Sequence, residues 1–158
     1  MDEQKTAKIG LLVFALTLII AALGFMIWQS FRSPIKKMQP EYGFSLDGVK
    51  TAIESSYVDS SFRDNWSIYA VSVEGERAGT LFDDQVMQDG IPDTVKAAVK
   101  SKNASLKKNG ITPLLTIDPK HQYKYKLVFP KGGSTKLHVI LDVDKDLYYL
   151  IRGISVFP

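Results

Sequence analysis

The 158-residue chain contains no cysteine. This absence excludes disulfide bonds, thiol nucleophiles, zinc–thiolate sites and lipid attachment to a cysteine side chain. The chain also lacks a Walker A loop, a G-x-S-x-G elbow and the glycine fingerprint of dinucleotide-binding proteins. We therefore expect a protein without enzymatic activity or cofactor, whose domain relies on its hydrophobic core for stability.

Histidine is nearly as scarce, because His121 and His138 are the only two. Neither belongs to an H-E-x-x-H or H-x-E element, which a zinc enzyme would need. His121 follows a turn at residues 118–120 and is expected to be exposed to solvent. His138 lies opposite the apolar register of a strand, so it is expected on the surface or beside a neighbouring strand. No spacing in the sequence supports catalysis by these residues.

Charge is absent from residues 9–29 (IGLLVFALTLIIAALGFMIWQ), which form a long apolar run. As a helix with a rise of about 1.5 Å per residue, the run would extend roughly 30 Å, the thickness of the hydrocarbon core of a bilayer. It predicts a transmembrane helix behind a short polar tail at residues 1–8. The alternative is a cleaved secretory signal, but the apolar residues 25–28 prolong the run and favour a permanent anchor.

Four residues after or near the end of this run are candidates for contact with the membrane interface. They are Trp28, Arg32, Lys36 and Lys37. An indole ring suits the headgroup layer, and the positive charges can reach lipid phosphates. The count of positive charges favours a cytoplasmic domain, whereas a single N-terminal span with a short tail is typical of an anchor that exports the domain behind it. We expect the C-terminal domain to be extracytoplasmic, either periplasmic or extracellular.

Residues 30–44 are expected to be a semi-extended juxtamembrane linker, because they contain two prolines and no hydrophobic periodicity. Residues 45–158 are long enough for one globular domain with its own core. The net charge of +3 and the isoelectric point near 9.0 are mildly basic. This balance suits an anionic bilayer surface, and we expect no nucleic-acid partner.

Two helices are predicted within the domain. Apolar residues recur at helical spacing over residues 45–57, which indicates the first. The second lies between Pro92-Asp93 and Asn109-Gly110, typical start and stop signals. Its apolar stripe consists of Val95, Ala98, Val99 and Leu106. Its opposite face carries Lys96, Lys100 and Lys107, which form either a solvated surface or a docking face for phosphate or lipid headgroups.

Six runs have β character: residues 66–73, 80–87, 111–117, 122–129, 136–143 and 147–156. The order of helices and strands lacks the regular alternation of a parallel sheet. We therefore predict an α+β fold with a mainly antiparallel sheet of about six strands and the two helices packed against one face. The last run is apolar on both faces, which indicates a central strand.

The motif D-x-D-x-D, formed by Asp142, Asp144 and Asp146, raises the possibility of a calcium site. An EF-hand loop would need glycine where Leu147 stands and glutamate where Gly153 stands. We interpret the motif as the polar tip of a hairpin and expect no metal.

Three classes of function are compatible with these observations. The leading hypothesis is a non-enzymatic single-pass protein whose exported domain recognises another membrane or envelope protein, as an interaction, assembly or accessory (immunity-type) subunit. The alternative is a small-ligand-binding or sensor domain, which requires a concave apolar pocket between helices and sheet. A third is a hydrolase that uses carboxylates such as Asp83 and Asp84, which requires a cleft with perturbed acids.

Overall fold

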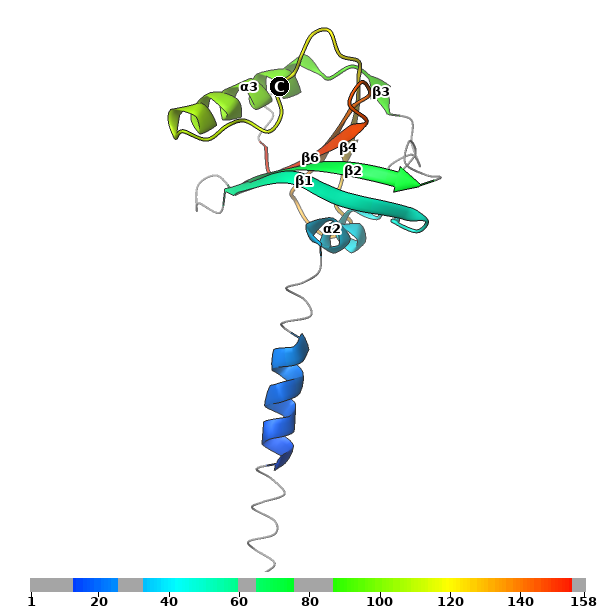
Figure 1. Ribbon diagram of the computed structural model, residues 1–158, viewed down its shortest axis with the longest axis vertical. Coiled ribbons are helices and arrows are strands. Elements are labelled where there is room, and N and C mark those ends of the chain that lie inside the picture. The colour runs from blue at the N-terminus through cyan, green and yellow to red at the C-terminus, as the bar shows by residue number, and fades with distance from the viewer. Residues whose placement is uncertain (1–12, 26–32, 60–64, 76–86, 155–158) are drawn as a thin grey trace, which may run out of the picture. The chain divides into compact units, whose positions relative to one another are not determined.

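The computed structural model describes residues 13–25, 33–59, 65–75 and 87–154 (Figure 1). The chain divides into two compact units, Met1–Lys37 and Met38–Pro158. The described part of the first unit contains a helix at residues 13–25. The second unit contains an α+β domain, which confirms the predicted fold class.

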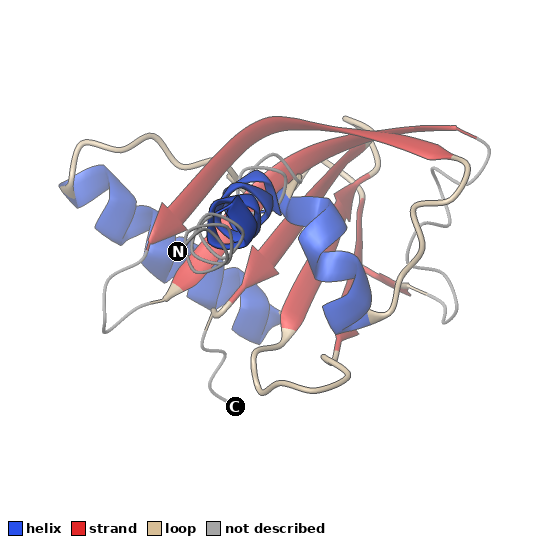
Figure 2. Ribbon diagram, turned by 90° about the horizontal axis from the view of Figure 1, so that it is seen from below, coloured by secondary structure: helices blue, strands red, loops and turns tan. Residues whose placement is uncertain are grey.

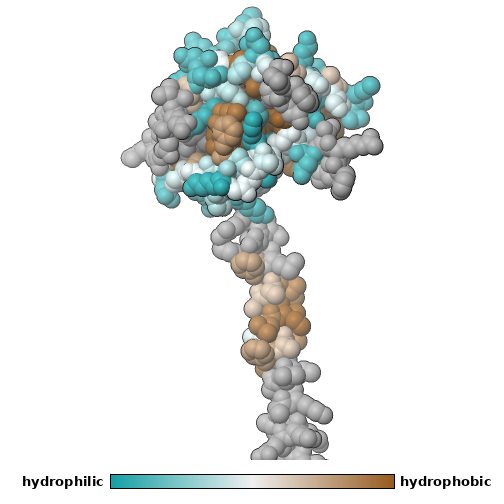
Figure 3. All heavy atoms as spheres, turned by 180° about the vertical axis from the view of Figure 1, so that it is seen from behind, coloured by the Kyte–Doolittle hydropathy of each residue, from teal (hydrophilic) through white to brown (hydrophobic). Residues whose placement is uncertain are grey.

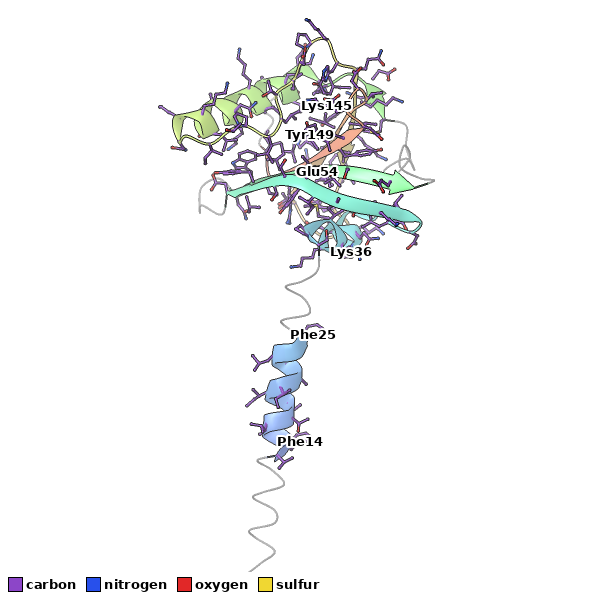
Figure 4. All side chains as sticks on the ribbon, in the orientation of Figure 1. Phe14, Phe25, Lys36, Glu54, Lys145 and Tyr149 are labelled. Carbon is purple, nitrogen blue, oxygen red and sulfur yellow. The ribbon has the colours of Figure 1, made fainter. Side chains whose placement is uncertain are left out.

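The helix at residues 13–25 is apolar on all sides. Its large side chains, from Val13 to Phe25, are between 53% and 65% exposed. Figure 3 shows this apolar surface, and Figure 4 shows Phe14 and Phe25 projecting away from the helix axis. Among the residues that the structure describes, no helix is both long and apolar enough to cross a membrane. Both ends of the predicted 9–29 span, including Trp28, lie outside the described residues.

A second helix, α2 (Pro34–Tyr42), corrects the semi-extended conformation expected for most of residues 30–44. Pro34 occupies the first helical position, where the missing N–H would be unpaired anyway and the fixed φ favours the helix. The proline therefore starts this helix. The helix ends at Gly43, which has a φ of 73° and donates its N–H to the Gln39 carbonyl at 2.8 Å.

The domain is built on a six-stranded antiparallel sheet in the order β1-β2-β6-β5-β4-β3. The strands are β1 (Val49–Asp59), β2 (Trp66–Gly75), β3 (Gln88–Asp89), β4 (Tyr123–Val128), β5 (Leu137–Asp142) and β6 (Leu147–Arg152). The prediction that the last strand is central is confirmed, because β6 pairs with both β2 and β5.

The part of α2 from Met38 and the helix α3 (Asp93–Lys108) lie on opposite faces of the sheet (Figures 1 and 2). The two helices predicted to cover one face were residues 45–57 and the segment between Pro92 and Gly110. Only the second of these is a helix, so that arrangement is not found. On one face, α3 buries Val95, Val99 and Leu106 in a core that includes aromatic residues of β2, β4 and β6. The other face of β5 buries Val139, which is 0% exposed. Because both faces of the sheet are covered, β6 is apolar on both of its sides.

The second half of α2, from Met38, is attached to the domain by polar contacts as well as burial. Met38 and Tyr42 are buried one helical turn apart. The Tyr42 hydroxyl donates to the Thr135 carbonyl at 2.8 Å. Arg152 on β6 donates to the Glu41 carboxylate at 2.8 Å. Contacts with β6 and with the segment before β5 thus stabilise a helix that contains Pro40 in its interior.

The helix predicted at residues 45–57 is wrong, because most of this segment belongs to the edge strand β1. A bulge between Ile53 and Ser55 shifts its register against β2. Ile53 therefore lies on one face of the sheet, whereas Tyr57 lies on the other, with its ring 5.3 Å from that of Trp66. The bulge interrupts the two-residue alternation that identifies a strand, and the remaining apolar spacing resembles that of a helix.

The predicted start and end of α3 are confirmed. Pro92 precedes the first turn, and its carbonyl accepts the Lys96 N–H at 3.0 Å. At the other end, Gly110 has a φ of 73°. The Ile111 N–H donates to the Leu106 carbonyl at 2.9 Å, the bond pattern of a Schellman motif.

Two further strand predictions have different outcomes. Residues 111–117 form no strand, yet Leu115 is buried and its carbonyl accepts a hydrogen bond from Asn103 of α3 at 2.7 Å. The segment therefore packs on the core as an irregular loop. Most of the predicted strand at 80–87 lies outside the described residues, and the short β3 follows it.

Candidate functional site

A groove of about 1050 Å³ runs beside α3. Its floor is apolar and contains Ile91, Val99 and Tyr123, all of which are buried. One wall is α3, and the other is the loop that leads from α3 to β4. The remaining lining residues are Lys96, Lys100, Asn103, Ala104 and Lys107 of α3, Thr116, Ile117, Asp118, Pro119, His121 and Gln122 of the loop, and Asp89 and Gly90.

The lysine face of α3, defined as Lys96, Lys100 and Lys107, forms part of one wall. All three side chains are exposed and line the groove. The Lys96 ammonium lies 2.9 Å from the Asp93 carboxylate, but this pair is largely exposed and contributes little. The α3 wall therefore carries positive charge, whereas the opposite side carries Asp89 and Asp118. The groove is polarised across its width.

Hydrogen bonds hold the loop wall in place. The Asp118 N–H donates to the Tyr123 hydroxyl at 3.0 Å. Farther along, the Gln122 N–H donates to the Asp144 carboxylate at 2.6 Å, and the Val143 N–H donates to the Gln122 carbonyl at 2.9 Å. The loop is thus attached to the turn between β5 and β6, so this wall is preformed.

At the end of the loop wall, His121, Asp142 and Asp144 form a cluster whose ligand atoms all lie within 4.8 Å of one another. His121 Nδ1 lies 3.0 Å and 3.2 Å from the two carboxylate oxygens of Asp142. The Asp142 side chain is fully buried, and its Oδ1 accepts the Lys145 N–H at 3.2 Å. Figure 4 shows Lys145 at the turn and Tyr149 on β6. The cluster combines a buried charge with an imidazole.

Two tyrosines beside the cluster are held in their protonated form. Burial raises the pKa of Tyr123, and the hydrogen bond from Asp118 opposes this effect. Burial also raises the pKa of Tyr149, and the negative charge of Asp142 adds to that increase. Both hydroxyls therefore remain neutral, so they can donate hydrogen bonds but do not act as bases.

The D-x-D-x-D motif is divided by the fold. Asp142 ends β5, and Asp144 lies in the turn, as the hairpin interpretation predicted. Asp146, which has a φ of 51°, is outside the cluster. His121 takes its place, and the expectation that this side chain is solvated is corrected. It is 24% exposed and pairs with Asp142.

Of the other candidate residues, two are described by the structure and four are not. Lys36 and Lys37, predicted to contact the membrane interface, are exposed on α2, and Figure 4 labels Lys36. Arg32, like Trp28, lies outside the described residues. Asp83 and Asp84, the carboxylates considered for hydrolysis, also lie outside them.

Comparison with known proteins adds no family to this description. A scan against protein-family models and searches of curated proteins and of solved structures found no match to the chain.

Proposed function

We propose that the chain is a single-pass membrane protein whose domain binds a small amphipathic anion in the groove beside α3. The main support for this proposal is the groove, which combines a volume of about 1050 Å³, an apolar floor and positive charge on a single wall. Small ligands bind in concave, mostly apolar sites with a few oriented polar groups. The domain then acts without catalysis, as a tethered ligand-binding or sensor module.

The lining of the groove defines the class of ligand. An apolar body would contact Ile91, Val99 and Tyr123 on the floor, and an anionic group would point towards Lys100 and Lys107. Exposed ion pairs contribute up to about 1 kcal/mol each, so most of the affinity would come from the apolar contact. The lysines would determine the orientation of the ligand and its preference for negative charge.

The probe for this proposal is 1-naphthyl phosphate, and uncharged 1-naphthol is its matched control. Titration calorimetry of the full chain in lipid nanodiscs, corrected with empty nanodiscs, is expected to show one site that prefers the phosphate. Replacing Lys100 or Lys107 with alanine should weaken phosphate binding about fivefold, the equivalent of about 1 kcal/mol.

Lys108→Ala is the control substitution, because Lys108 is exposed on the same helix but does not line the groove. It should leave the affinity unchanged. The proposal fails if neither compound binds at millimolar concentration, or if Lys108→Ala weakens binding as much as Lys107→Ala does.

The membrane anchor in this proposal is the helix predicted at residues 9–29. Its support is the described part at 13–25, whose surface is apolar on every side, as lipid contact requires. Lys36 and Lys37 would lie near lipid phosphates, and the domain would be extracytoplasmic. Fusions after Pro158 test the orientation: alkaline phosphatase should be active, and a reporter that fluoresces only in the cytoplasm should be dark. The reverse result would place the domain in the cytoplasm.

A second candidate function, binding to another membrane or envelope protein, is favoured by the edge strand β1. Among the described residues no strand pairs with its outer side, and it is 11 residues long. An exposed edge of this length can accept a strand from a partner. A photo-crosslinker at Ala52 or Ser56, both exposed on β1, should then capture a partner that a crosslinker at Lys124 does not. Equal capture from all three positions would contradict edge pairing.

A further inference from the structure

We propose that His121, Asp142 and Asp144 form a binding site for a divalent transition-metal cation, with Zn²⁺ as the best fit. The site lies where the loop wall meets the turn between β5 and β6. It does not depend on the ligand proposed for the groove, because two of its three donors, Asp142 and Asp144, do not line the groove and only His121 is shared.

The separation of the donor atoms suits a small metal ion. Zn²⁺ lies about 2.0–2.2 Å from histidine nitrogen and carboxylate oxygen, so two ligand atoms at the tetrahedral angle are about 3.4 Å apart. His121 Nδ1 lies 3.0 Å and 3.2 Å from the two carboxylate oxygens of Asp142, so a movement of a few tenths of an ångström gives this separation. Asp144 belongs to an exposed turn, and its ligand atom lies within 4.8 Å of the other two. A small rotation of this side chain completes a three-ligand set.

The Asp142 carboxylate has acceptor capacity to spare. It is 0% exposed, and an ionised carboxylate offers about four acceptor positions. Among the described residues, its hydrogen-bond donors are His121 Nδ1, which carries at most one hydrogen, and the Lys145 N–H. The Lys145 ammonium lies 3.6 Å from Oδ2, but this side chain is 49% exposed. It can turn into solvent when a cation binds.

A fourth residue, Asp118, lies where the hydrogen-bond acceptor for the second ring nitrogen of a metal-bound histidine is expected. Histidines that bind metals through one ring nitrogen usually direct the N–H of the other towards a carboxylate. The Asp118 carboxylate lies 4.0 Å from His121 Nε2. The Lys120 N–H donates to the other oxygen of Asp118 at 2.9 Å, which holds this carboxylate in place. When Nδ1 binds the metal, Nε2 keeps its hydrogen and faces Asp118.

The donor types select the ion. One imidazole nitrogen and two carboxylate oxygens suit Zn²⁺, whereas Ca²⁺ takes six to eight oxygen ligands and Mg²⁺ retains most of its waters. Three protein ligands leave at least one position of the metal to water.

The test uses the full chain, purified without a polyhistidine tag and freed of metal with a chelator. Calorimetry with ZnCl₂ is expected to show one ion per chain, and MgCl₂ at the same concentration should give no binding. CoCl₂ should produce visible absorption bands from direct coordination. His121→Gln and Asp144→Asn should each weaken Zn²⁺ binding at least tenfold and abolish the cobalt bands, with unchanged circular dichroism.

Asp146→Asn is the matched control, because Asp146 belongs to the same turn and the same sequence motif but not to the cluster. Its Zn²⁺ affinity should stay within about twofold of the parent value, since the residue supplies no ligand. The proposal is overturned if Zn²⁺ shows no saturable binding, or if binding survives both ligand substitutions. It is equally overturned if Asp146→Asn removes binding, which would indicate a site formed by the turn alone.

Discussion

Acidification is expected to destabilise the domain through His138, a buried side chain of β5. The residue is 3% exposed, and its Nδ1 lies 2.8 Å from the Tyr125 hydroxyl. Burial, with a smaller contribution from the charge of Lys136, lowers the pKa of His138 from 6.5 to about 4. Between these pH values the unfolded chain binds a proton that the folded chain does not. Stability that is fully present above pH 6.5 is therefore lost progressively as the pH falls towards 4.

The size of this effect follows from the difference between the two pKa values. At about 1.4 kcal/mol per pH unit, a pKa lowered from 6.5 to about 4 corresponds to at most about 3 kcal/mol. At pH 5 the loss from His138 reaches about 2 kcal/mol. Small domains are stable by only about 5–15 kcal/mol, so a single imidazole removes a measurable part of the total.

Urea unfolding of the full chain, followed by tryptophan fluorescence, measures this loss. Between about pH 7.5 and pH 5, the parent should lose about 2 kcal/mol more unfolding free energy than His138→Gln, which cannot take up the proton. Tyr125→Phe is the control: it removes the hydrogen-bond partner but leaves His138 buried, so its pH dependence should match that of the parent. Parallel pH profiles for the parent and His138→Gln would refute the reasoning.

Three further predictions concern stability. Gly153→Ala should lower the unfolding free energy by more than about 2 kcal/mol, because the residue has a φ of 76° and an added Cβ would meet the Asn65 carbonyl oxygen. Gly48 has the same φ, but no atom lies within 4 Å of an added Cβ, so Gly48→Ala should lower the unfolding free energy by only about 1 kcal/mol. Urea unfolding measures both variants, and equal losses would rule out the clash at Gly153. Deleting residues 146–158 removes β6 and should abolish the cooperative thermal transition; a truncated chain that melts at the original midpoint would show that β6 is dispensable. Tyr42→Phe breaks the bond to Thr135 and should reduce the unfolding free energy by about 1 kcal/mol, and an unchanged urea midpoint would mean that this bond adds nothing.

The elements that the sequence predicted correctly are those determined by local chemistry. Pro92 and Gly110 mark the ends of α3 because a proline at the start and a glycine at a positive φ suit any helix. The turn at residues 144–146 follows from polar residues between two apolar strands. In both cases the signal lies within a few residues of the feature, so no tertiary contact is needed to recognise it.

The elements that could not be predicted from the sequence depend on distant partners. Along β1 the apolar side chains change from one face of the sheet to the other. The change occurs at a bulge in the pairing of β1 with β2. The helical conformation around Pro40 is stabilised by contacts with residues far along the chain, such as the bond between Tyr42 and Thr135. Local propensity describes neither case, because tertiary contacts override it.

The candidate site shows the same division. The lysine face of α3 follows from helical spacing, but the opposite wall of the groove does not, since residues 111–117 were expected in the sheet. The pairing of Tyr123 with Asp142 brings His121 next to the buried carboxylate. That register could be derived only after β4 and β5 were recognised as neighbours. The signal that could have identified this cluster is the position of His121 just before β4 and of Asp142 at the end of β5. In an antiparallel pair these two positions lie side by side.

The position of β6 between β2 and β5 has a consequence for how the protein is made. Among the described residues, the hairpin β1–β2 joins the rest of the sheet through β6, which follows the other five strands along the chain. During synthesis, the inner side of β2 therefore remains unpaired until β6 has emerged. Pairing over such a distance along the chain is slow. Until then the unpaired side of β2 is exposed to other chains, so a chaperone that shields extended segments would act before β6 is in place.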